Sequence, residues 1–202
     1  MLSARDITLE RNFAPVFEPV DICLSAENLL LVTGPNGCGK TTLIRILAGL
    51  LRPSRGTVSI SAEPGGHPGP VYVGHQLGIK DDLSVLENIR FMLGFMGGGR
   101  FPAQEIARRL GLQHVRGQAA RTLSAGQRKR CALARVFAGD RPLWLLDEPY
   151  SNLDAEGMSM LNQLLRQHLD AGGACVMTTH GSLRPEAFEY RECVLVPGRE
   201  LH

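Results

Sequence analysis

A glycine-rich octapeptide between an apolar run and an amphipathic segment constrains the fold of this chain more than any other feature. It matches the pattern G-x-x-x-x-G-K-[ST] and reads Gly34-Pro35-Asn36-Gly37-Cys38-Gly39-Lys40-Thr41. The four apolar residues at 29–32 are typical of a strand buried on both faces, and residues 40–50 have the apolar spacing of a helix. A buried strand, a glycine turn and a helix in this order predict a phosphate-binding loop in an α/β fold.

The chemistry of this octapeptide points to a nucleoside triphosphate. Glycines let backbone N–H groups converge on phosphate oxygens, and the N-terminus of the following helix is electropositive. Lys40 adds a positive charge at the β- and γ-phosphates, and the Thr41 hydroxyl can ligate Mg²⁺. We therefore expect residues 34–42, Thr42 included, to contact the nucleotide. The alternative is a glycine-rich turn with a chance lysine, which the flanking strand and helix disfavour.

Apolar patterning along the chain predicts one α/β domain over residues 1–202. Strands are expected at 3–9, 20–24, 29–32, 57–61, 71–73, 143–146, 174–178 and 192–196. Helices are expected at 40–50, 85–96, 102–110, 124–138 and 155–169. Because residues 76–140 are mainly helical, we expect an inserted helical lobe on an α/β core. Phe91, Met92, Phe95 and Met96 are interpreted as a core-facing stripe of this lobe, and docking of a partner helix is the alternative.

Composition excludes several functional classes. Lys and Arg number 22 and Asp and Glu number 20, so the formal charge of +2 argues against a dedicated nucleic-acid binder. Apolar runs fall short of the roughly 18 residues that a transmembrane helix requires, and the N-terminus lacks the pattern of a signal peptide. The five cysteines are scattered and form no CxxC pair, so we expect neither a disulfide framework nor a zinc site. We therefore expect the chain to work in a reducing cytoplasm.

Two carboxylates follow the apolar residues 143–146. Asp147 and Glu148 would stand at the carboxyl end of a strand, where ligands bind in open α/β sheets. Asp147 can hold Mg²⁺ directly or through water, and Glu148 can orient or deprotonate an attacking water. An isolated Asp-Glu pair would more often be a solvated strand end. Beside a phosphate-binding loop, the pair instead indicates phosphoryl chemistry.

Residues 123–127 read Leu-Ser-Ala-Gly-Gln. Ser124 and Gln127 have the spacing of a capping box, so the simplest interpretation is a helix start. Gly126 adds an approachable helix N-terminus, which can bind an anion. The basic residues that follow, Arg128, Lys129, Arg130 and Arg135, are interpreted as a solvated face.

The order of these motifs resembles that of ATP-binding cassette (ABC) ATPase subunits. The matching elements are the phosphate-binding loop, Gln76, the sequence at 123–127, the Asp147-Glu148 pair, residues 151–154 and His180. They span nearly the whole chain, and the sequence at 123–127 is the most specific among them. The resemblance implies an ABC-type ATPase core of the phosphate-loop class, with an N-terminal antiparallel β portion, and ATP and Mg²⁺ as cofactors.

The resemblance also implies roles for single residues. Two copies of the chain would pair head to tail, and Ser124, Gly126 and Gln127 of one copy would face the ATP bound by the other. Gln76 would contact Mg²⁺ or the attacking water, His180 would bind the γ-phosphate, and both would join Glu148 as catalytic residues. Asp154 would help to connect the two sites. In the family's pattern an aromatic residue stacks on adenine, and this place falls on Arg11, with Phe13 nearby.

The sequence at residues 72–80 resembles one particular group of ABC ATPases. It contains Gly-His-Gln-Leu-Gly-Ile-Lys and, with residues 142–149 and 178–180, is similar to the ATP-binding subunits of cytochrome c maturation systems. That resemblance implies a peripheral subunit on the cytoplasmic face of the bacterial inner membrane, bound to small integral membrane subunits. Its ATP hydrolysis would drive haem export or release haem from a periplasmic carrier. The alternatives are an ATPase of a lipid, lipoprotein or drug exporter, a non-transport ABC protein, or a small-molecule kinase.

Overall fold

A five-stranded parallel sheet forms the centre of the computed structural model, which describes residues 1–61, 69–139, 141–179, 185 and 188–198. Its strands, in spatial order, are β10 (Arg191–Val194), β5 (Leu29–Thr33), β9 (Ala174–Thr178), β8 (Leu143–Leu146) and β7 (Val71–Val73). All neighbouring strands run parallel. Their carboxyl ends therefore meet at one edge, and the loops that follow them gather there.

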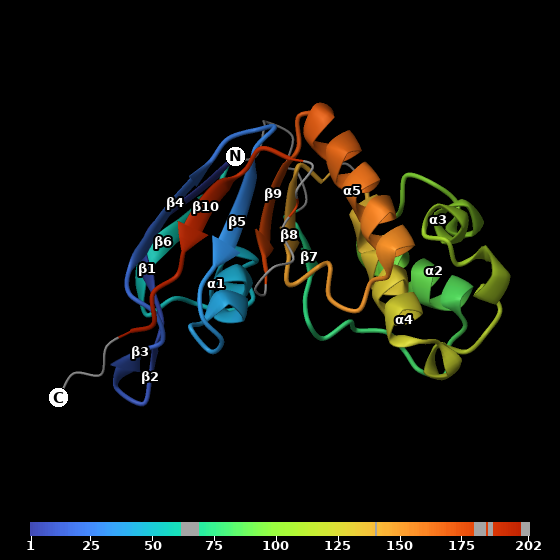
Figure 1. Ribbon diagram of the computed structural model, residues 1–202, viewed down its shortest axis with the longest axis horizontal. Coiled ribbons are helices and arrows are strands. Elements are labelled where there is room, and N and C mark those ends of the chain that lie inside the picture. Colours follow the sequence, from blue (N-terminus) through green and yellow to red (C-terminus); the bar gives the residue numbers. More distant parts are fainter. Residues whose placement is uncertain (62–68, 140, 180–184, 186–187, 199–202) are drawn as a thin grey trace.

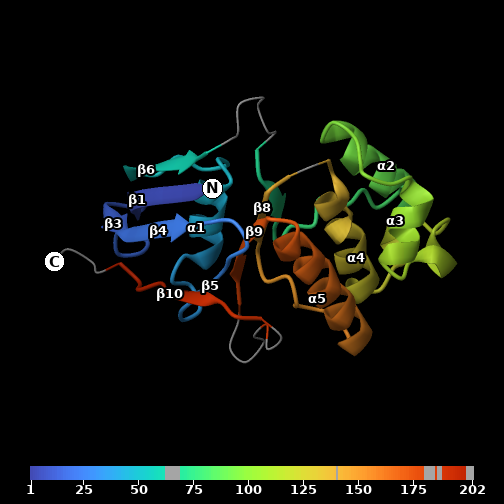
Figure 2. The same ribbon diagram turned by 90° about the horizontal axis from the view of Figure 1, so that it is seen from above.

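An antiparallel sheet covers one side of this centre (Figure 1). Its strands, in spatial order, are β4 (Val20–Leu24), β1 (Leu2–Thr8) and β6 (Arg55–Ile60). Helix α1 (Lys40–Leu47) lies between the two sheets, as the view from above also shows (Figure 2). A short hairpin of β2 (Glu10–Arg11) and β3 (Ala14–Pro15) extends from the antiparallel sheet. The sequence did not predict this hairpin, because two-residue strands are too short to show a period.

The remaining helices gather on the other side of the parallel sheet (Figure 1). They are α2 (Val85–Phe95), α3 (Ala103–Arg109), α4 (Ala125–Ala132) and α5 (Ala155–Asp170), with 3₁₀ turns η1 (Gln113–Val115), η2 (Ala120–Thr122) and η3 (Leu133–Phe137). None of the helices in the described part of the chain is long and apolar enough to cross a membrane.

The prediction of one helix over 124–138 is wrong, because α4 ends at Ala132 and the chain continues as η3. Such tightening is common at helix C-termini. Apolar patterning could not reveal it, since all residues of η3 except Arg135 are apolar and buried and would suit either kind of helix.

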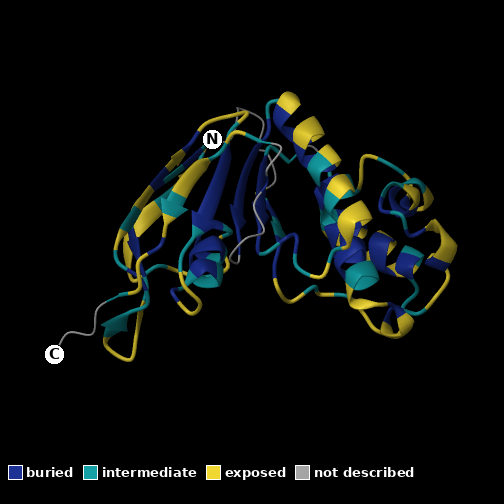
Figure 3. Cartoon of the chain, viewed as in Figure 1, coloured by how far each residue is buried: buried dark blue, intermediate teal, exposed yellow. Residues whose placement is uncertain are grey.

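The apolar core lies on both faces of the parallel sheet. Leu30 and Val32 of β5 face α1 and the antiparallel sheet, whereas Leu29 and Leu31 face the helices on the other side. Successive strand residues point to opposite faces, so a strand covered on both sides must be apolar throughout. Figure 3 shows this as continuous burial along the central strands. The burial explains why these strands read as unbroken apolar runs.

Candidate nucleotide-binding site

The glycine loop connects β5 to α1, and its backbone conformation requires glycine. Gly34, Gly37 and Gly39 have φ angles of 141°, 78° and 98°, in the region that side chains rarely adopt. A Cβ at Gly34 would lie 2.5 Å from the Leu195 carbonyl oxygen, and one at Gly39 would lie 2.7 Å from the Phe17 ring. The loop is thus held in a narrow turn that leads its backbone into the N-terminus of α1.

Lys40 and Thr41 open α1, and their polar groups lie near different partners. The Lys40 ammonium folds back over the loop and donates to the carbonyl oxygens of Gly34 at 2.7 Å and Pro35 at 3.1 Å. The Thr41 hydroxyl donates to Asp147 Oδ1 at 3.2 Å. Cys38 is buried with its side chain in the core, so only its backbone is available to a ligand. The structure therefore brings the loop and the carboxylate after β8 together.

Asp147 is almost fully buried at the carboxyl end of β8. Its Oδ1 accepts hydrogen bonds from the hydroxyls of Thr178 at 2.7 Å and Thr41 at 3.2 Å. Its Oδ2 is also buried, and within the described residues it has no hydrogen-bond partner. Sequence reasoning missed Thr178 as a site residue, although a polar residue that ends an otherwise apolar strand was a usable signal.

Glu148 stands in a strained turn directly after Asp147. Its φ of 47° lies in the left-handed region, which is uncommon for residues other than glycine and often marks active sites. Its backbone N–H donates to the Thr178 hydroxyl at 2.9 Å. The same threonine thus bonds the Asp147 carboxylate and fixes the backbone of Glu148.

A buried lysine contacts this turn from the side of α4. The Lys129 ammonium donates to the carbonyl oxygens of Glu148 at 2.8 Å and Asp147 at 3.4 Å, and the residue is only 2% exposed. Burial lowers its pKa to about 8, while the charges of Asp147 and Glu148 oppose that shift. Arg130, its neighbour, is 8% exposed. The interpretation of Arg128, Lys129, Arg130 and Arg135 as a solvated face is therefore wrong, because Lys129 and Arg130 are buried and Arg128 and Arg135 are half-buried.

The sequence Leu-Ser-Ala-Gly-Gln begins α4 with a complete capping box, as predicted. The Ser124 hydroxyl accepts from the Gln127 N–H at 3.2 Å, and the Ser124 N–H donates to Gln127 Oε1 at 3.0 Å. A Cβ at Gly126 would lie 2.8 Å from the Asn152 carbonyl oxygen, so the chain that leads to α5 passes close by. These residues line a polar hollow together with Asp154.

Asp154 connects α4 to the start of α5. Its carboxylate accepts from the Gly157 N–H at 2.9 Å, which caps α5, and it pairs with Arg130. The hydrogen bond from Gly157 and then the one from Arg130 hold the pKa of Asp154 below its ordinary value. Asp154 itself is exposed, so it lies on a surface that another molecule can reach.

Gln76 follows β7, the strand beside β8. Val73 pairs with Leu146, and the Asp147 N–H donates to the Val73 carbonyl at 2.8 Å. Gln76 is exposed three residues beyond that point. Its loop therefore leaves the sheet at the same edge as Asp147.

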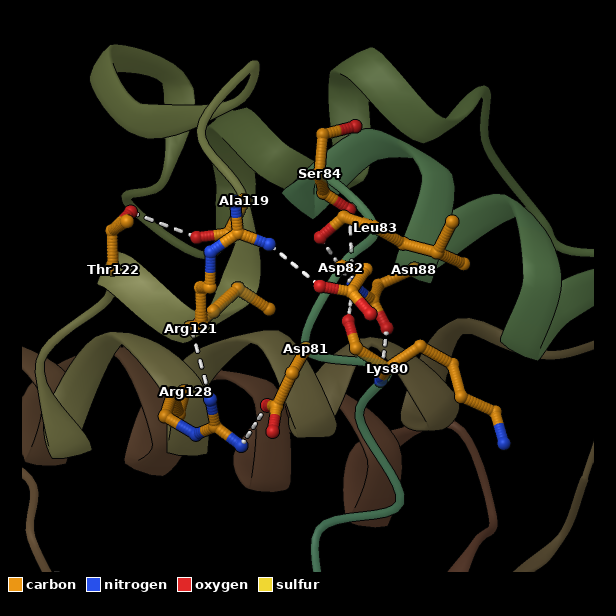
Figure 4. Close-up of polar contacts among 11 residues, drawn as sticks. Lys80, Asp81, Asp82, Leu83, Ser84, Asn88, Ala119, Arg121, Thr122 and Arg128 are labelled. Carbon is orange, nitrogen blue, oxygen red and sulfur yellow. Dashed lines mark hydrogen bonds and ion pairs between the residues drawn. The ribbon is translucent and has the colours of Figure 1, made fainter.

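The segment after this loop is fastened to the helical part of the chain (Figure 4). Asn88 of α2 is fully buried and donates to the carbonyl oxygens of Lys80, Leu83 and Ser84, each at 3.0 Å. Its own oxygen accepts from the Lys80 N–H at 2.8 Å. In the same cluster Asp81 pairs with Arg128 at 2.7 Å and Asp82 with Arg121 at 2.6 Å.

The residues predicted to bind the γ-phosphate and adenine, His180 and Arg11, remain to be placed. His180 lies outside the described residues. Arg11 is exposed in β2, opposite Ala14, and the hairpin turn carries Asn12 and Phe13 with φ angles of 50° and 64°. Phe13 is 98% exposed, which is unusual for an aromatic side chain in a strained turn.

The fold and this constellation define a nucleotide-hydrolysing cassette, and comparison with known proteins gives its class. Residues 17–151 match the family described as ABC transporter, and the chain belongs to that family. It has a TM-score of 0.84 to the ATP-binding cassette MJ0796 bound to ADP and Pi, at 24% identity, with 97% of this chain and 94% of that chain covered. This confirms the predicted fold class, an α/β, phosphate-loop, ABC-type ATPase core with an N-terminal antiparallel sheet.

Curated relatives carry a more specific name. The cytochrome c biogenesis ATP-binding export protein CcmA of Xanthomonas axonopodis pv. citri is 47% identical over 188 residues, which cover 90% of this chain and 87% of the relative. CcmA of Pseudomonas syringae pv. syringae is 40% identical over 95% of this chain and 93% of the relative. The resemblance inferred from the motifs is confirmed. The chain is an ATP-binding, ATP-hydrolysing subunit of the ABC class.

Proposed function

We propose that this chain is the ATPase subunit of a cytochrome c biogenesis complex, in which ATP hydrolysis drives haem export or releases haem from its periplasmic carrier. The observation that carries the proposal is the identity of 40–47% over nearly the full length of relatives named for that process. ATP + H₂O → ADP + phosphate is the reaction. Haem handling belongs to the membrane subunits and the carrier.

The described residues fit Mg²⁺ as the metal of this reaction. Asp147 presents a buried oxygen that has no hydrogen-bond partner among the described residues, and the Thr41 hydroxyl lies 3.2 Å from the other oxygen of the same carboxylate. Oxygen ligands of this kind, completed by phosphate oxygens, suit Mg²⁺. Asp147 and Thr41 would hold the ion, with Gln76 as a further ligand. When bound, Mg²⁺ offsets negative charge on the β- and γ-phosphates.

Other residues of the chain bind the phosphates, position the attacking water and stack on adenine. The backbone N–H groups of residues 36–42 bind phosphate oxygens, and the Lys40 ammonium exchanges its two carbonyl partners for the β- and γ-phosphates. Glu148 accepts a proton from the attacking water or orients that water. His180 binds the γ-phosphate and Gln76 lies by the attacking water. Arg11 stacks on adenine, with the exposed Phe13 as the alternative at the same hairpin.

A second copy of the chain completes the site. Ser124, Gly126 and Gln127 line a polar hollow at the N-terminus of α4, which suits the γ-phosphate of ATP bound by the partner copy. MJ0796, which shares the fold, forms a dimer in its ADP- and Pi-bound structure. We assign residues 1–202 to one nucleotide-binding domain, with residues 76–140 as its helical lobe.

The membrane subunits bind a groove beside the helical lobe that is lined by apolar side chains together with Arg135 and Arg141. Phe91 and Phe95 are 51% and 88% exposed. Leu50, which follows α1, lines the same groove and is 58% exposed. The interpretation of Phe91, Met92, Phe95 and Met96 as a core-facing stripe is wrong for the two phenylalanines, whereas Met92 is buried and Met96, directly after α2, is partly buried against the core. Exposed aromatic side chains around a groove suit a partner helix. This attachment would hold the chain at the cytoplasmic face of the inner membrane.

Complementation tests the proposal. The chain is expressed in a bacterium that lacks its own cytochrome c maturation ATPase, and covalent haem in c-type cytochromes is measured by haem staining. Wild type should restore the stain and Lys40→Ala should not, because Lys40 binds the phosphates.

Two other results would redirect the assignment. If the chain hydrolyses ATP but restores no c-type cytochrome, it serves another exporter. If phosphate is instead transferred to an added acceptor, the chain is a kinase. Membrane-subunit pull-down separates a transporter component from both a kinase and a non-transport ABC protein.

A further inference from the structure

Three consecutive basic residues of α4 bond to three different elements around the site. Arg128 pairs with Asp81, in the segment that leads from Gln76 to α2, and donates to the Ala120 carbonyl at 2.9 Å. Arg130 pairs with Asp154 at the start of α5. Lys129, between them, reaches the turn after β8. One short helix thus contacts three segments around the phosphate site: the one that follows Gln76, the turn after β8 and the start of α5.

Lys129 has the most unusual surroundings of the three. Arg128 and Arg130 pair with exposed carboxylates, whereas the Lys129 ammonium is buried and donates to two main-chain carbonyls, 2.8 Å and 3.4 Å away. A buried cation is unfavourable unless its hydrogen bonds and nearby negative charge compensate the lost hydration. The carboxylates of Asp147 and Glu148 supply that charge. The position therefore suits an ammonium that donates to the backbone of the turn at Asp147 and Glu148.

We propose that Lys129 is a positioning residue for ATP hydrolysis: by donating to the carbonyl oxygens of Asp147 and Glu148, it holds the turn that presents the Glu148 carboxylate. The turn is held from two sides. Thr178 of β9 bonds the Glu148 N–H and the Asp147 carboxylate, and Lys129 of α4 bonds the two carbonyls. Glu148 keeps its left-handed backbone because both sides oppose relaxation of the turn.

The same contact connects the catalytic turn to the sequence at 123–127. Lys129 lies two residues after Gln127 on the same helix, so a displacement of the N-terminus of α4 is passed to the carbonyls of the turn. Arg128 and Arg130 fix the same helix to the segment after Gln76 and to Asp154. Lys129 therefore ties the orientation of Glu148 to the helix that receives the partner copy's ATP.

The test compares four full-length proteins purified in the membrane complex with which the chain associates. Lys129→Met keeps a long unbranched side chain but removes the donor, and Lys129→Gln keeps a neutral amide donor. Arg116→Met is the matched control, because Arg116 is an exposed basic residue that bonds only to the nearby Gln113 carbonyl among the described contacts of its side chain. ATP affinity, the number of bound nucleotides and the hydrolysis rate are measured on each protein.

The expected result is a change in turnover per bound nucleotide. Lys129→Met should lower kcat per bound ATP by about 10- to 100-fold, the scale of a small misplacement at a catalytic group, with ATP affinity changed by less than about 3-fold. Lys129→Gln should retain more of kcat than Lys129→Met, and Arg116→Met should match wild type. A purely structural role would lower the number of binding sites and leave turnover per site unchanged.

Turnover per site of Lys129→Met within about 2-fold of Arg116→Met would overturn the proposal. If Lys129→Met does not fold, Lys129→Gln decides: its turnover per site should fall below that of Arg116→Met, because a neutral amide is a weaker donor than an ammonium, and equal turnover would also overturn the proposal. The proposal rests on ATP hydrolysis and not on cytochrome c biogenesis, so failure of complementation leaves this assay intact.

Discussion

The burial of His168 of α5, which stacks on Trp144 of β8, should make the stability of this protein depend on pH. The two rings lie 3.8 Å apart between centroids and 8° from parallel, and His168 is only 8% exposed. Its Nε2 lies 3.1 Å from the Ala174 carbonyl, to which it donates. Burial lowers the pKa of His168 from 6.5 to about 4, the Ala174 hydrogen bond opposes this, and the nearby charge of Arg100 adds to it.

The sign of the effect follows from proton binding. The pKa is lower in the folded protein, so between about pH 6.5 and pH 4 the unfolded chain binds the proton more strongly, and acidification favours unfolding. Stability from this group is fully present above the unfolded pKa and is lost as the pH falls toward the folded one. From pH 7 to pH 5 the two pKa values give a loss of about 2 kcal/mol in the free energy of unfolding.

The assay is urea unfolding at both pH values, followed by the fluorescence of Trp144, the single tryptophan of the chain. His168→Gln is the reference, because an amide can still donate to Ala174 but does not titrate. Far-UV circular dichroism on both proteins checks that the variant unfolds in the same transition. Wild type should lose about 2 kcal/mol more than His168→Gln on acidification. Losses that agree within about 0.5 kcal/mol would refute the reasoning.

Three further perturbations test the site and its supports. Glu148→Gln should lower ATP turnover by about 10²- to 10⁴-fold, as expected for a general base, and leave ATP binding intact, whereas full steady-state turnover would contradict its role. Gly34→Ala places a Cβ 2.5 Å from a backbone carbonyl, so its thermal midpoint should fall below that of Gly37→Ala, whose Cβ meets nothing within 4 Å; equal midpoints would argue against the clash. Asn88→Leu should lower the free energy of unfolding by about 2–4 kcal/mol, because four hydrogen bonds between the buried amide and the backbone are lost, among them the one that the amide oxygen accepts from the Lys80 N–H. Asp82→Asn breaks only an exposed ion pair and should cost less than about 1 kcal/mol in the same urea titration, so similar losses for the two variants would refute the importance of the buried amide.

The local motifs were readable because each depends on a short stretch of chain. The strand, glycine turn and helix around Lys40 are neighbours in sequence, and their backbone geometry follows from residue type. The capping box of Ser124 and Gln127 is likewise complete within four residues. The central strands were also predictable, since a strand covered on both faces must be apolar.

What sequence reasoning missed depends on contacts between distant segments. Residues 128–130 look like an exposed basic face, and only the packing of α4 against the turn after β8 shows that Lys129 is buried. Phe91 and Phe95 share the helical spacing of buried Met92, and only the neighbouring elements decide which side of α2 is covered. Periodicity assigns faces to a helix without saying what lies opposite each face.

The sequence by itself determined the phosphate-binding loop, the strand that delivers Asp147 and Glu148, and the class of protein. The tertiary structure alone decided how these parts meet. Parallel strands β5, β9 and β8 end at one edge, so the hydroxyls of Thr41 and Thr178 both bond to Asp147, which lies 106 and 31 positions away from them in the sequence. Each of these hydrogen bonds joins side chains from different elements, and no local pattern specifies a distance that only the folded sheet creates.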